Sequence, residues 1–314
     1  SRSSAKISET GIGSRPGEVP PRSGVRTSGL AITGLEELDM GLTLSGLEGK
    51  VAVVTGAGRL RSIGRSIALE LARAGCDVAI TGTGRDASTY PDDEKAVGWR
   101  DIESVAEEIR QLGRRALPVV SDVSDLSSVE ALSRRVESEL GPVDFVVNNA
   151  GAARGGDRVG IVEIDPATWR RVIDVNLNGS FYMSHVFGRR LIERGEGGAI
   201  INISSIGGKM MPPNNAAYAA SKAGLHALTA AMSGEVGSHG IRVNAICPGI
   251  IETSRMDDIP RGPVWDEMIS TYVPLGRCGS PEEIGYMTVY LCSDQGAWIT
   301  GQLYSVDGGQ VAGR

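Results

Sequence analysis

Tyr218 and Lys222 are the two side chains of this 314-residue sequence best suited to moving a proton. Their separation of four, at the start of a stretch with apolar residues at helical spacing, places both on one face of a helix. A free phenol has a pKa of about 10 and exchanges protons poorly near neutral pH. A neighbouring ammonium stabilises the phenolate and lowers that pKa. The pair predicts a tyrosine acid/base, but its spacing alone is not distinctive.

A glycine-rich loop near the amino terminus has the pattern of a phosphate-binding loop. It runs Thr55-Gly56-Ala57-Gly58-Arg59-Leu60-Arg61-Ser62-Ile63-Gly64, after an apolar run and before a helix-like segment. Glycines let the backbone approach a pyrophosphate, whose charge is stabilised by the free N–H groups at the helix start. The loop therefore predicts a dinucleotide cofactor held by Gly56, Gly58, Arg59, Arg61, Ser62, Ile63 and Gly64.

The end of the next apolar run bears on the choice between NAD and NADP. Sites that prefer NAD carry Asp or Glu here to hold the ribose hydroxyls, and this position falls closest to Gly82. Arg59, Arg61 and Arg85 lie within reach of a 2′-phosphate. The pattern favours NADP over NAD, with solvated loop arginines as the alternative reading.

The elements that must position these residues follow a regular alternation. Apolar runs at 51–54, 78–81, 117–120, 143–147, 199–203, 242–246 and 303–306 are separated by segments of helical periodicity. Such runs predict a parallel sheet covered on both faces. The expected fold is α/β: a single doubly wound, Rossmann-type domain over residues 47–314, with a seven-stranded parallel sheet flanked by helices. Residues 1–46 are expected to form a flexible amino-terminal tail, its more apolar part from residue 29 onward serving as an arm.

Composition excludes several other classes of function. The net charge is −6, which gives no reason to expect nucleic acid or an anionic membrane as partner. Four scattered cysteines and three histidines show no metal-ligand spacing, so no metal is expected. No apolar run reaches the roughly 18 residues of a membrane helix. We expect a soluble, cytoplasmic protein that acts on a small molecule.

Further motifs, taken together, resemble the short-chain dehydrogenases/reductases. Asn148-Asn149-Ala150-Gly151, Asn176-Leu177, Ser204-Ser205, Tyr218 with Lys222, Asn244, Pro248-Gly249, Thr253 and Val306-Asp307-Gly308-Gly309 appear in the order that this family shows. Ser205 stands thirteen residues before Tyr218, and this spacing favours it over Ser204. The resemblance covers residues 47 to about 310, nearly all of the chain outside the tail.

The resemblance implies a role for each matching residue. Tyr218 would exchange the proton with the substrate oxygen, Lys222 would hold the nicotinamide ribose and tune Tyr218, and Ser205 would hydrogen-bond the substrate oxygen. Asn176 would hold a helix bend and a proton-relaying water. The remaining cofactor contacts would come from Arg85, Asp122, Val123, Asn149, Ala150, Gly151, Pro248, Gly249, Ile251 and Thr253. The resemblance also implies a homotetramer.

Two departures from the family pattern stand out. The phosphate loop carries two extra residues and Ser62 where glycine is usual, as in the enoyl-thioester reductase branch. That branch spaces its Tyr and Lys seven apart, so the spacing of four argues against enoyl reduction. Residues 86–100 form an extra segment, which we expect to be an exposed variable loop; the alternatives are packing over the adenosine end or against a neighbouring subunit.

The substrate pocket is expected between residues 152–154, 210–213 and 250–276, where Met256, Trp265, Met268 and Tyr272 offer apolar surface. The sequence favours NADPH-dependent reduction of a ketone, including a 3-oxoacyl thioester. An NAD-dependent dehydrogenase of a cyclic alcohol, diol or sugar is the enzymatic alternative. A cofactor-binding scaffold without turnover is the alternative from another class.

Overall fold

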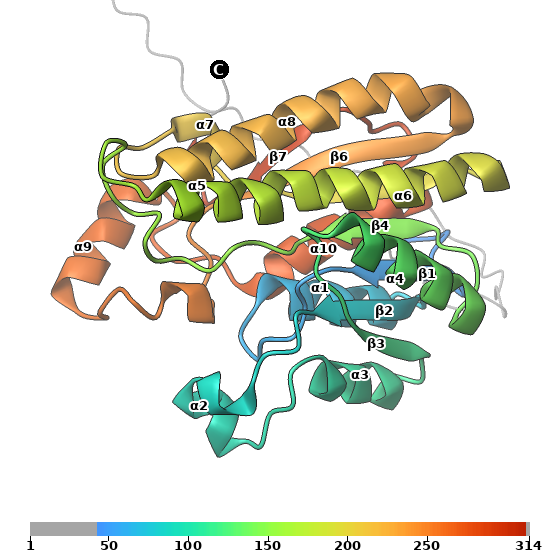
Figure 1. Ribbon diagram of the computed structural model, residues 1–314, viewed down its shortest axis with the longest axis horizontal. Helices are drawn as coiled ribbons and strands as arrows, with labels where there is room; N and C mark the ends of the chain where they lie inside the picture. The colour runs from blue at the N-terminus through green and yellow to red at the C-terminus, as the bar shows by residue number, and fades with distance from the viewer. Residues whose placement is uncertain (1–42, 312–314) are drawn as a thin grey trace, which may run out of the picture. The chain divides into compact units, whose positions relative to one another are not determined.

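The structure, a computed structural model, describes residues 43–311 and contains a seven-stranded, entirely parallel sheet (Figure 1). The strand order is β3-β2-β1-β4-β5-β6-β7. Their bounds are β1 Val51–Val54, β2 Asp77–Gly82, β3 Ala116–Val120, β4 Phe145–Asn148, β5 Gly198–Ile203, β6 Ile241–Pro248 and β7 Leu303–Val306. Chain order reverses beside β1, and in a doubly wound sheet the cofactor binds at this switch point. The predicted fold class is confirmed.

Helices cover both faces of the sheet because the strand side chains alternate between two buried clusters. Ala52 and Val54 face one cluster and Val51 and Val53 the other. Helices α1 (Ile63–Arg73), α3 (Ile102–Gln111) and α10 (Pro281–Cys292) contribute to the first cluster. Helices α4 (Leu126–Glu139), α6 (Gly179–Arg194) and α8 (Ala216–Val236) lie on the other face. Continuous burial on both sides explains the uninterrupted apolar runs of the sequence.

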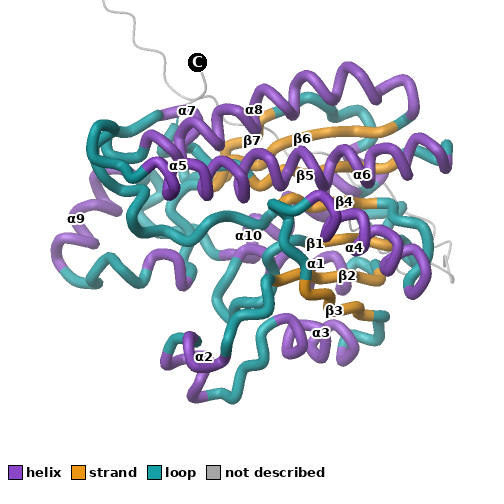
Figure 2. Tube along the Cα trace, in the orientation of Figure 1, coloured by secondary structure: helices purple, strands orange, loops and turns teal. Residues whose placement is uncertain are grey.

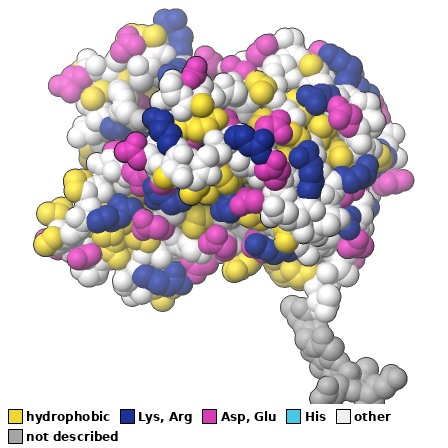
Figure 3. Space-filling model, turned by 90° about the horizontal axis from the view of Figure 1, so that it is seen from below, with side chains coloured by type: hydrophobic (Ala, Val, Ile, Leu, Met, Phe, Trp, Pro, Cys, Tyr) yellow, Lys and Arg dark blue, Asp and Glu magenta, His cyan; other side chains and the backbone are white. Residues whose placement is uncertain are grey.

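The amino-terminal boundary is marked by two contacts. Leu47 is buried in the first cluster, and the Ser45 hydroxyl donates to Asp294 at 3.0 Å. The remainder of the predicted tail and arm, residues 1–42, lies outside the described residues. No helix in the described part of the chain is long and apolar enough to cross a membrane. On the face shown in Figure 3, acidic and basic side chains are interspersed.

The long connections gather at the carboxyl ends of the strands, on the side where α2 (Asp92–Ala96), α7 (Gly207–Met210) and α9 (Pro263–Tyr272) lie (Figure 2). Helix α5 (Pro166–Ile173) begins on this side and continues towards α6 through a π-helical turn, Asp174–Asn178. Loops at this edge carry the ligand site in open parallel sheets. The residues singled out by the sequence therefore converge here.

Most of residues 86–100 are exposed, as expected for a surface loop. The segment also includes helix α2 and is attached to the phosphate loop by two side chains. Glu94 is buried and accepts hydrogen bonds from the Leu60 amide at 3.0 Å and from Arg85 at 2.9 Å. The Trp99 indole donates to the Gly58 carbonyl at 2.7 Å. A buried carboxylate with these partners fixes the segment in place.

Candidate functional site

Tyr218 lies in the first turn of α8 because the preceding residues cannot remain helical. Pro212 and Pro213 lack an N–H group and follow Met211, whose positive φ of 50° ends α7. Helix α8 then begins at Ala216, and Lys222 follows Tyr218 one turn later. The buried Lys222 ammonium donates to the Ile203 carbonyl at 2.8 Å and lies 5.8 Å from the Tyr218 ring centroid. Helix α8 and the end of β5 thus fix this pair.

Ser205 joins Tyr218 directly, whereas Ser204 points elsewhere. The Ser205 hydroxyl is hydrogen-bonded to the Tyr218 side chain and accepts from the Gly207 amide at 2.9 Å. The Ser204 hydroxyl contacts the His226 ring at 2.8 Å and donates to the Lys222 carbonyl at 3.2 Å. The two adjacent serines therefore have different surroundings, and only Ser205 is directed at the phenol.

Asn176 is buried in the π-helical turn Asp174–Asn178, and this irregular turn directs its amide towards α8. Its Nδ2 donates to the Ser221 hydroxyl at 3.0 Å, and its Oδ1 accepts from the Ala152 amide at 2.8 Å. The Ser221 hydroxyl in turn donates to the Tyr218 carbonyl at 2.7 Å. Through these hydrogen bonds, Asn176 links the loop after β4 to α8, the helix that carries Tyr218.

The electrostatics of the pair match the prediction from its spacing. Burial by itself raises the pKa of Tyr218, but the positive charges of Lys222 and Arg255, the hydrogen bond with Ser205 and the charge of Arg158 outweigh it and bring the pKa below its ordinary value of 10. Burial is also the main reason that the pKa of Lys222 is lowered, and Tyr218 partly opposes that effect. Phenolate and ammonium thus stabilise each other.

Two arginines that the sequence did not point to stand beside the phenol. The guanidinium carbon of Arg158 lies 4.5 Å from the Tyr218 ring centroid, and that of Arg255 lies 5.3 Å from it. Arg255 also donates to the Ala152 carbonyl at 2.8 Å, and Arg154 pairs with Asp258 at 2.8 Å. These contacts join the segments 152–154 and 250–276, two of the expected pocket walls.

The phosphate loop presents a helix start suited to an anion. Ser62 caps α1 by accepting from the Arg65 amide at 3.2 Å, and within residues 43–311 no acceptor engages the amides of Ile63 and Gly64. Asn149 secures the other side of the loop by donating to the carbonyls of Thr55 at 2.8 Å and Gly56 at 3.0 Å. The loop therefore fits a pyrophosphate, the group that the sequence predicted for it.

An acid lies beside Gly82 although none occupies that position in the sequence. Asp101, directly before α3, is buried and has a φ of 54°. A Cβ built on Gly82 would lie 3.5 Å from Asp101 Oδ2, and one on Gly58 would lie 1.6 Å from Oδ1. Oδ1 accepts from Arg85 at 3.1 Å, whereas Oδ2 has no hydrogen-bond partner in the described chain. Asp101 therefore places a carboxylate near the end of β2, the region in which dinucleotide sites hold the ribose hydroxyls.

The predicted phosphate-binding arginines differ in how they are engaged. Arg61 is paired with Asp93 at 2.7 Å and with Asp257, and its carbonyl accepts from the Ser254 amide at 3.0 Å. Arg85 is paired with both Glu94 and Asp101. Arg59 is exposed. Arg61 and Arg85 therefore face protein carboxylates, and Arg61 connects the phosphate loop to segment 250–276.

The other predicted cofactor residues lie at the same edge of the sheet. Asp122 and Val123 follow β3, Ala150 and Gly151 follow β4, and Pro248, Gly249, Ile251 and Thr253 end or follow β6. Ala150 packs against Gly56 so closely that a Cβ there would lie 2.7 Å from the Ala150 Cα. Val123 packs against Gly179 in the same way, because a Cβ added to Gly179 would lie 2.7 Å from Cγ2 of Val123. Close packing at these points leaves no space for larger residues.

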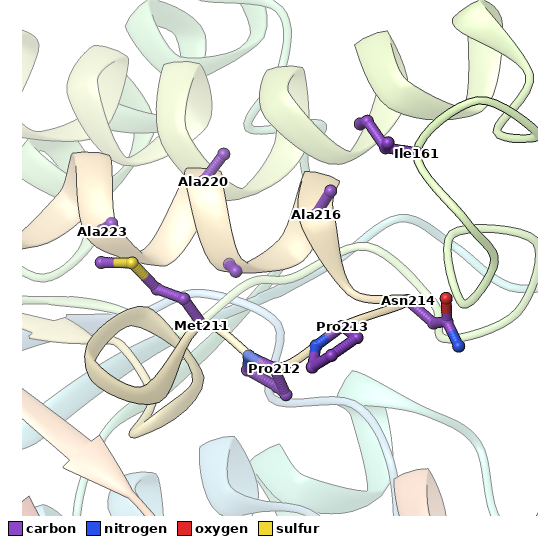
Figure 4. A pocket seen from close by; sticks show the side chains of 9 residues that line it. Ile161, Met211, Pro212, Pro213, Asn214, Ala216, Ala220 and Ala223 are labelled. Atoms are coloured by element: carbon purple, nitrogen blue, oxygen red, sulfur yellow. The ribbon is translucent and has the colours of Figure 1, made fainter.

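A pocket of about 530 Å³ lies along α8 (Figure 4). It is lined by Ile161, Met211, Pro212, Pro213, Asn214, Ala216, Ala219, Ala220 and Ala223. Part of the predicted wall 210–213 borders it, but Tyr218, Lys222 and Ser205 are not among its lining residues. Its apolar lining carries no acid/base group, so the chemistry is assigned to the polar cluster around Tyr218.

The family model described as enoyl-(acyl carrier protein) reductase matches residues 56–310. This chain belongs to the short-chain dehydrogenase/reductase family. It is an enzyme that acts on an alcohol or carbonyl group, and members of its family use NAD or NADP. The predicted resemblance is thereby confirmed, and the family extends over almost all of the described residues.

Relatives within the family differ in their substrates. The 3-oxoacyl-[acyl-carrier-protein] reductase FabG of Pseudomonas aeruginosa is 38% identical over 263 residues, 84% of this chain and 98% of the relative. The 2-dehydro-3-deoxy-D-gluconate 5-dehydrogenase of Dickeya dadantii is 33% identical over 270 residues, 85% and 97% of the two chains. A solved 7α-hydroxysteroid dehydrogenase, complexed with NADH and 7-oxo glycochenodeoxycholic acid, is 32% identical with a TM-score of 0.73, covering 84% of this chain and 95% of that one.

Proposed function

We propose that this protein is an NAD-dependent dehydrogenase that interconverts a secondary alcohol and its ketone, with Tyr218 as the general acid/base. The observation that supports it most directly is the position of the phenol, which is hydrogen-bonded to Ser205 and lies next to the buried ammonium of Lys222. The lowered pKa of Tyr218 makes its phenolate available to accept a proton closer to neutral pH.

Each residue has a separate task in this mechanism. Ser205 holds the substrate oxygen by a hydrogen bond, and Tyr218 removes the hydroxyl proton during oxidation or returns it during reduction. Lys222 uses one of its three N–H donors on the Ile203 carbonyl, which leaves the others for ribose hydroxyls. Asn176 positions the start of α8 through Ser221. A nicotinamide bound next to these residues would supply the hydride-transfer chemistry.

The choice of NAD rests on Asp101. An acid beside the end of β2 accepts from ribose hydroxyls and repels a 2′-phosphate, and Asp101 Oδ2 is buried without a partner there. The sequence favoured NADP because Gly82 is not acidic and three arginines are near. Two of these, Arg61 and Arg85, are paired with carboxylates. These contacts support NAD as the cofactor.

Reduction of a ketone, including a 3-oxoacyl thioester, with NADPH is the second candidate function. It is supported by the exposed Arg59 in the phosphate loop and by the similarity to the 3-oxoacyl-[acyl-carrier-protein] reductase. Similarity to the 2-dehydro-3-deoxy-D-gluconate 5-dehydrogenase supports oxidation of a sugar-derived alcohol instead. The relative affinity for NADH and NADPH, followed by nicotinamide fluorescence, separates the two candidates.

The role of Tyr218 is tested by replacing it with phenylalanine. Tyr218→Phe removes only the titrating oxygen, so NADH affinity should stay within about 3-fold of wild type, while turnover should fall by a factor on the order of 100 or more. Tyr286→Phe, on the exposed Tyr286 of α10, is the matched control and should keep full activity. A Tyr218→Phe enzyme that retains most of the wild-type turnover would refute the assigned role.

A further inference from the structure

An uncompensated positive charge borders the phenol of Tyr218. Arg158 and Arg255 come from two different connections, the one after β4 and the one after β6, yet both guanidinium groups lie within 5.3 Å of the same ring. We propose that these two arginines form a subsite for a carboxylate on the substrate, so that the enzyme acts on a hydroxy acid or oxo acid. This inference rests on the proposed function of Tyr218.

Arg158 is largely buried, with 22% of its side chain exposed. Its Nε has no hydrogen-bond partner in the described chain, although Asp157 lies 3.3 Å away. The other charged groups that act on it are Arg154, Arg255 and Tyr218. Burial lowers the pKa of Arg158, as expected for a charged group that is incompletely compensated. The partly exposed guanidinium of Arg158 beside the phenol is suited to bind an anion.

Arg255 has no carboxylate partner within residues 43–311. Its Nη1 donates to the Ala152 carbonyl at 2.8 Å, and this bond holds the side chain against segment 152–158. Neighbouring Arg154 differs, because Asp258 neutralises it. Arg261 differs as well, because it pairs with Glu252 and stacks on Trp265. Unlike Arg154 and Arg261, Arg255 therefore has no carboxylate partner in the described part of the chain.

The charge balance favours a carboxylate over a doubly charged phosphate. Arg158 and Arg255 are both positive and Asp157 is negative, which leaves one net positive charge at the subsite. Tyr218 as phenolate and Lys222 compensate each other. A monoanion completes this balance, and the planar guanidinium groups match the two oxygens of a carboxylate. Because both arginines lie against the ring, the carboxylate must be only a few bonds from the reacting carbon.

A competing explanation gives the arginines no contact with substrate. Both positive charges also lower the pKa of Tyr218, and they could serve that purpose alone. The two explanations differ in one measurable respect. A tuning role affects charged and neutral substrates equally, whereas a carboxylate subsite affects only the acid.

The test compares acids with their methyl esters. Pyruvate, acetoacetate and 4-oxopentanoate, each with its methyl ester, are titrated by calorimetry into protein loaded with NAD⁺, where a ketone cannot react. The same ketones are then assayed for turnover with NADH. The variants are Arg158→Met, Arg158→Lys and Arg255→Met, and Arg189→Met on the exposed face of α6 controls for net charge. The melting temperature of each variant confirms that it folds.

We expect at least one acid to bind about 10-fold or more tightly than its ester. Arg158→Met and Arg255→Met should each raise the Kd of the acid by about 10- to 100-fold and that of the ester by less than about 3-fold. Arg158→Lys should have an intermediate effect on the Kd of the acid, and Arg189→Met should leave it at the wild-type value. Equal binding of acid and ester, or equal losses for both in the variants, overturns the subsite. So does stronger competition by inorganic phosphate than by acetate. Binding that follows the arginines without any NADH turnover would instead refute the proposed function alone.

Discussion

The most decisive perturbation of the cofactor site is Asp101→Asn. Asparagine preserves the size of the side chain and tolerates the positive φ of 54°, so the change removes the charge without adding backbone strain. In the wild-type protein Oδ1 accepts from Arg85, and we propose that the carboxylate also holds one ribose hydroxyl of NADH. The variant is therefore expected to lose one charged hydrogen bond to NADH.

A hydrogen bond to a charged group contributes about 1.5–3 kcal/mol, so the Kd of NADH should rise about 10- to 100-fold. The Kd of NADPH should fall, because the carboxylate no longer repels the 2′-phosphate and Arg85 loses one of its two acidic partners. Nicotinamide fluorescence titration measures both constants. Glu103→Gln, at an exposed acid in the first turn of α3, controls for the loss of a negative charge.

Two outcomes would refute this reasoning. In the first, the wild-type protein binds NADPH more tightly than NADH, which would mean that Asp101 serves only to hold Arg85. In the second, Asp101→Asn leaves the ratio of the two Kd values unchanged, as Glu103→Gln should. Either result would return the assignment to the NADPH-dependent reductase that the arginines of the sequence favoured.

Three further predictions concern pH dependence, stability and assembly. The pKa of Tyr218 lies below 10 and the phenolate is the active form in oxidation, so kcat/KM for the alcohol should rise with pH and level off below pH 10. Arg255→Met removes a positive charge and should move this levelling-off to higher pH. An unchanged pH profile in the variant would contradict the role of Arg255 in lowering the pKa. Glu94→Gln breaks a buried pair with Arg85 and should lower the free energy of unfolding by about 3 kcal/mol in urea titration; a change below about 0.5 kcal/mol would show that the pair is dispensable. Light scattering should give a mass near four subunits, and a monomer would exclude the expected homotetramer.

The fold could be predicted because each buried strand leaves a local signature. All seven apolar runs became strands, and the differences are confined to their ends: the run at 242–246 extends to Ile241–Pro248, because backbone pairing continues beyond the apolar residues. The attachment of segment 86–100 to the phosphate loop escaped prediction. The segment's acidic, turn-like sequence resembles a solvated loop, and only the tertiary contacts of Glu94 with Arg85 and the Leu60 amide reveal its packing.

The residues of the candidate site likewise fall into those that the sequence predicted and those that it did not. Tyr218, Lys222 and Ser205 were accessible from the sequence because a helix and a strand end fix their spacing. Asp101 could not be predicted as a site residue. It lies nineteen positions after Gly82 in the sequence, and only the folding of the intervening segment brings it to the same edge of the sheet. Arg158 and Arg255 were missed because irregular connections have no periodicity that could indicate where a side chain points.

The bridge made by Arg61 has a kinetic consequence. Its guanidinium joins Asp93 to Asp257 and its carbonyl binds Ser254, so the loop expected to receive the pyrophosphate is attached to the segment bordering the substrate. Any cofactor that stabilises this arrangement also favours the wall formed by residues 250–276. We therefore expect an ordered reaction in which the dinucleotide binds first and leaves last. By reciprocity, each ligand should increase the affinity for the other by the same factor.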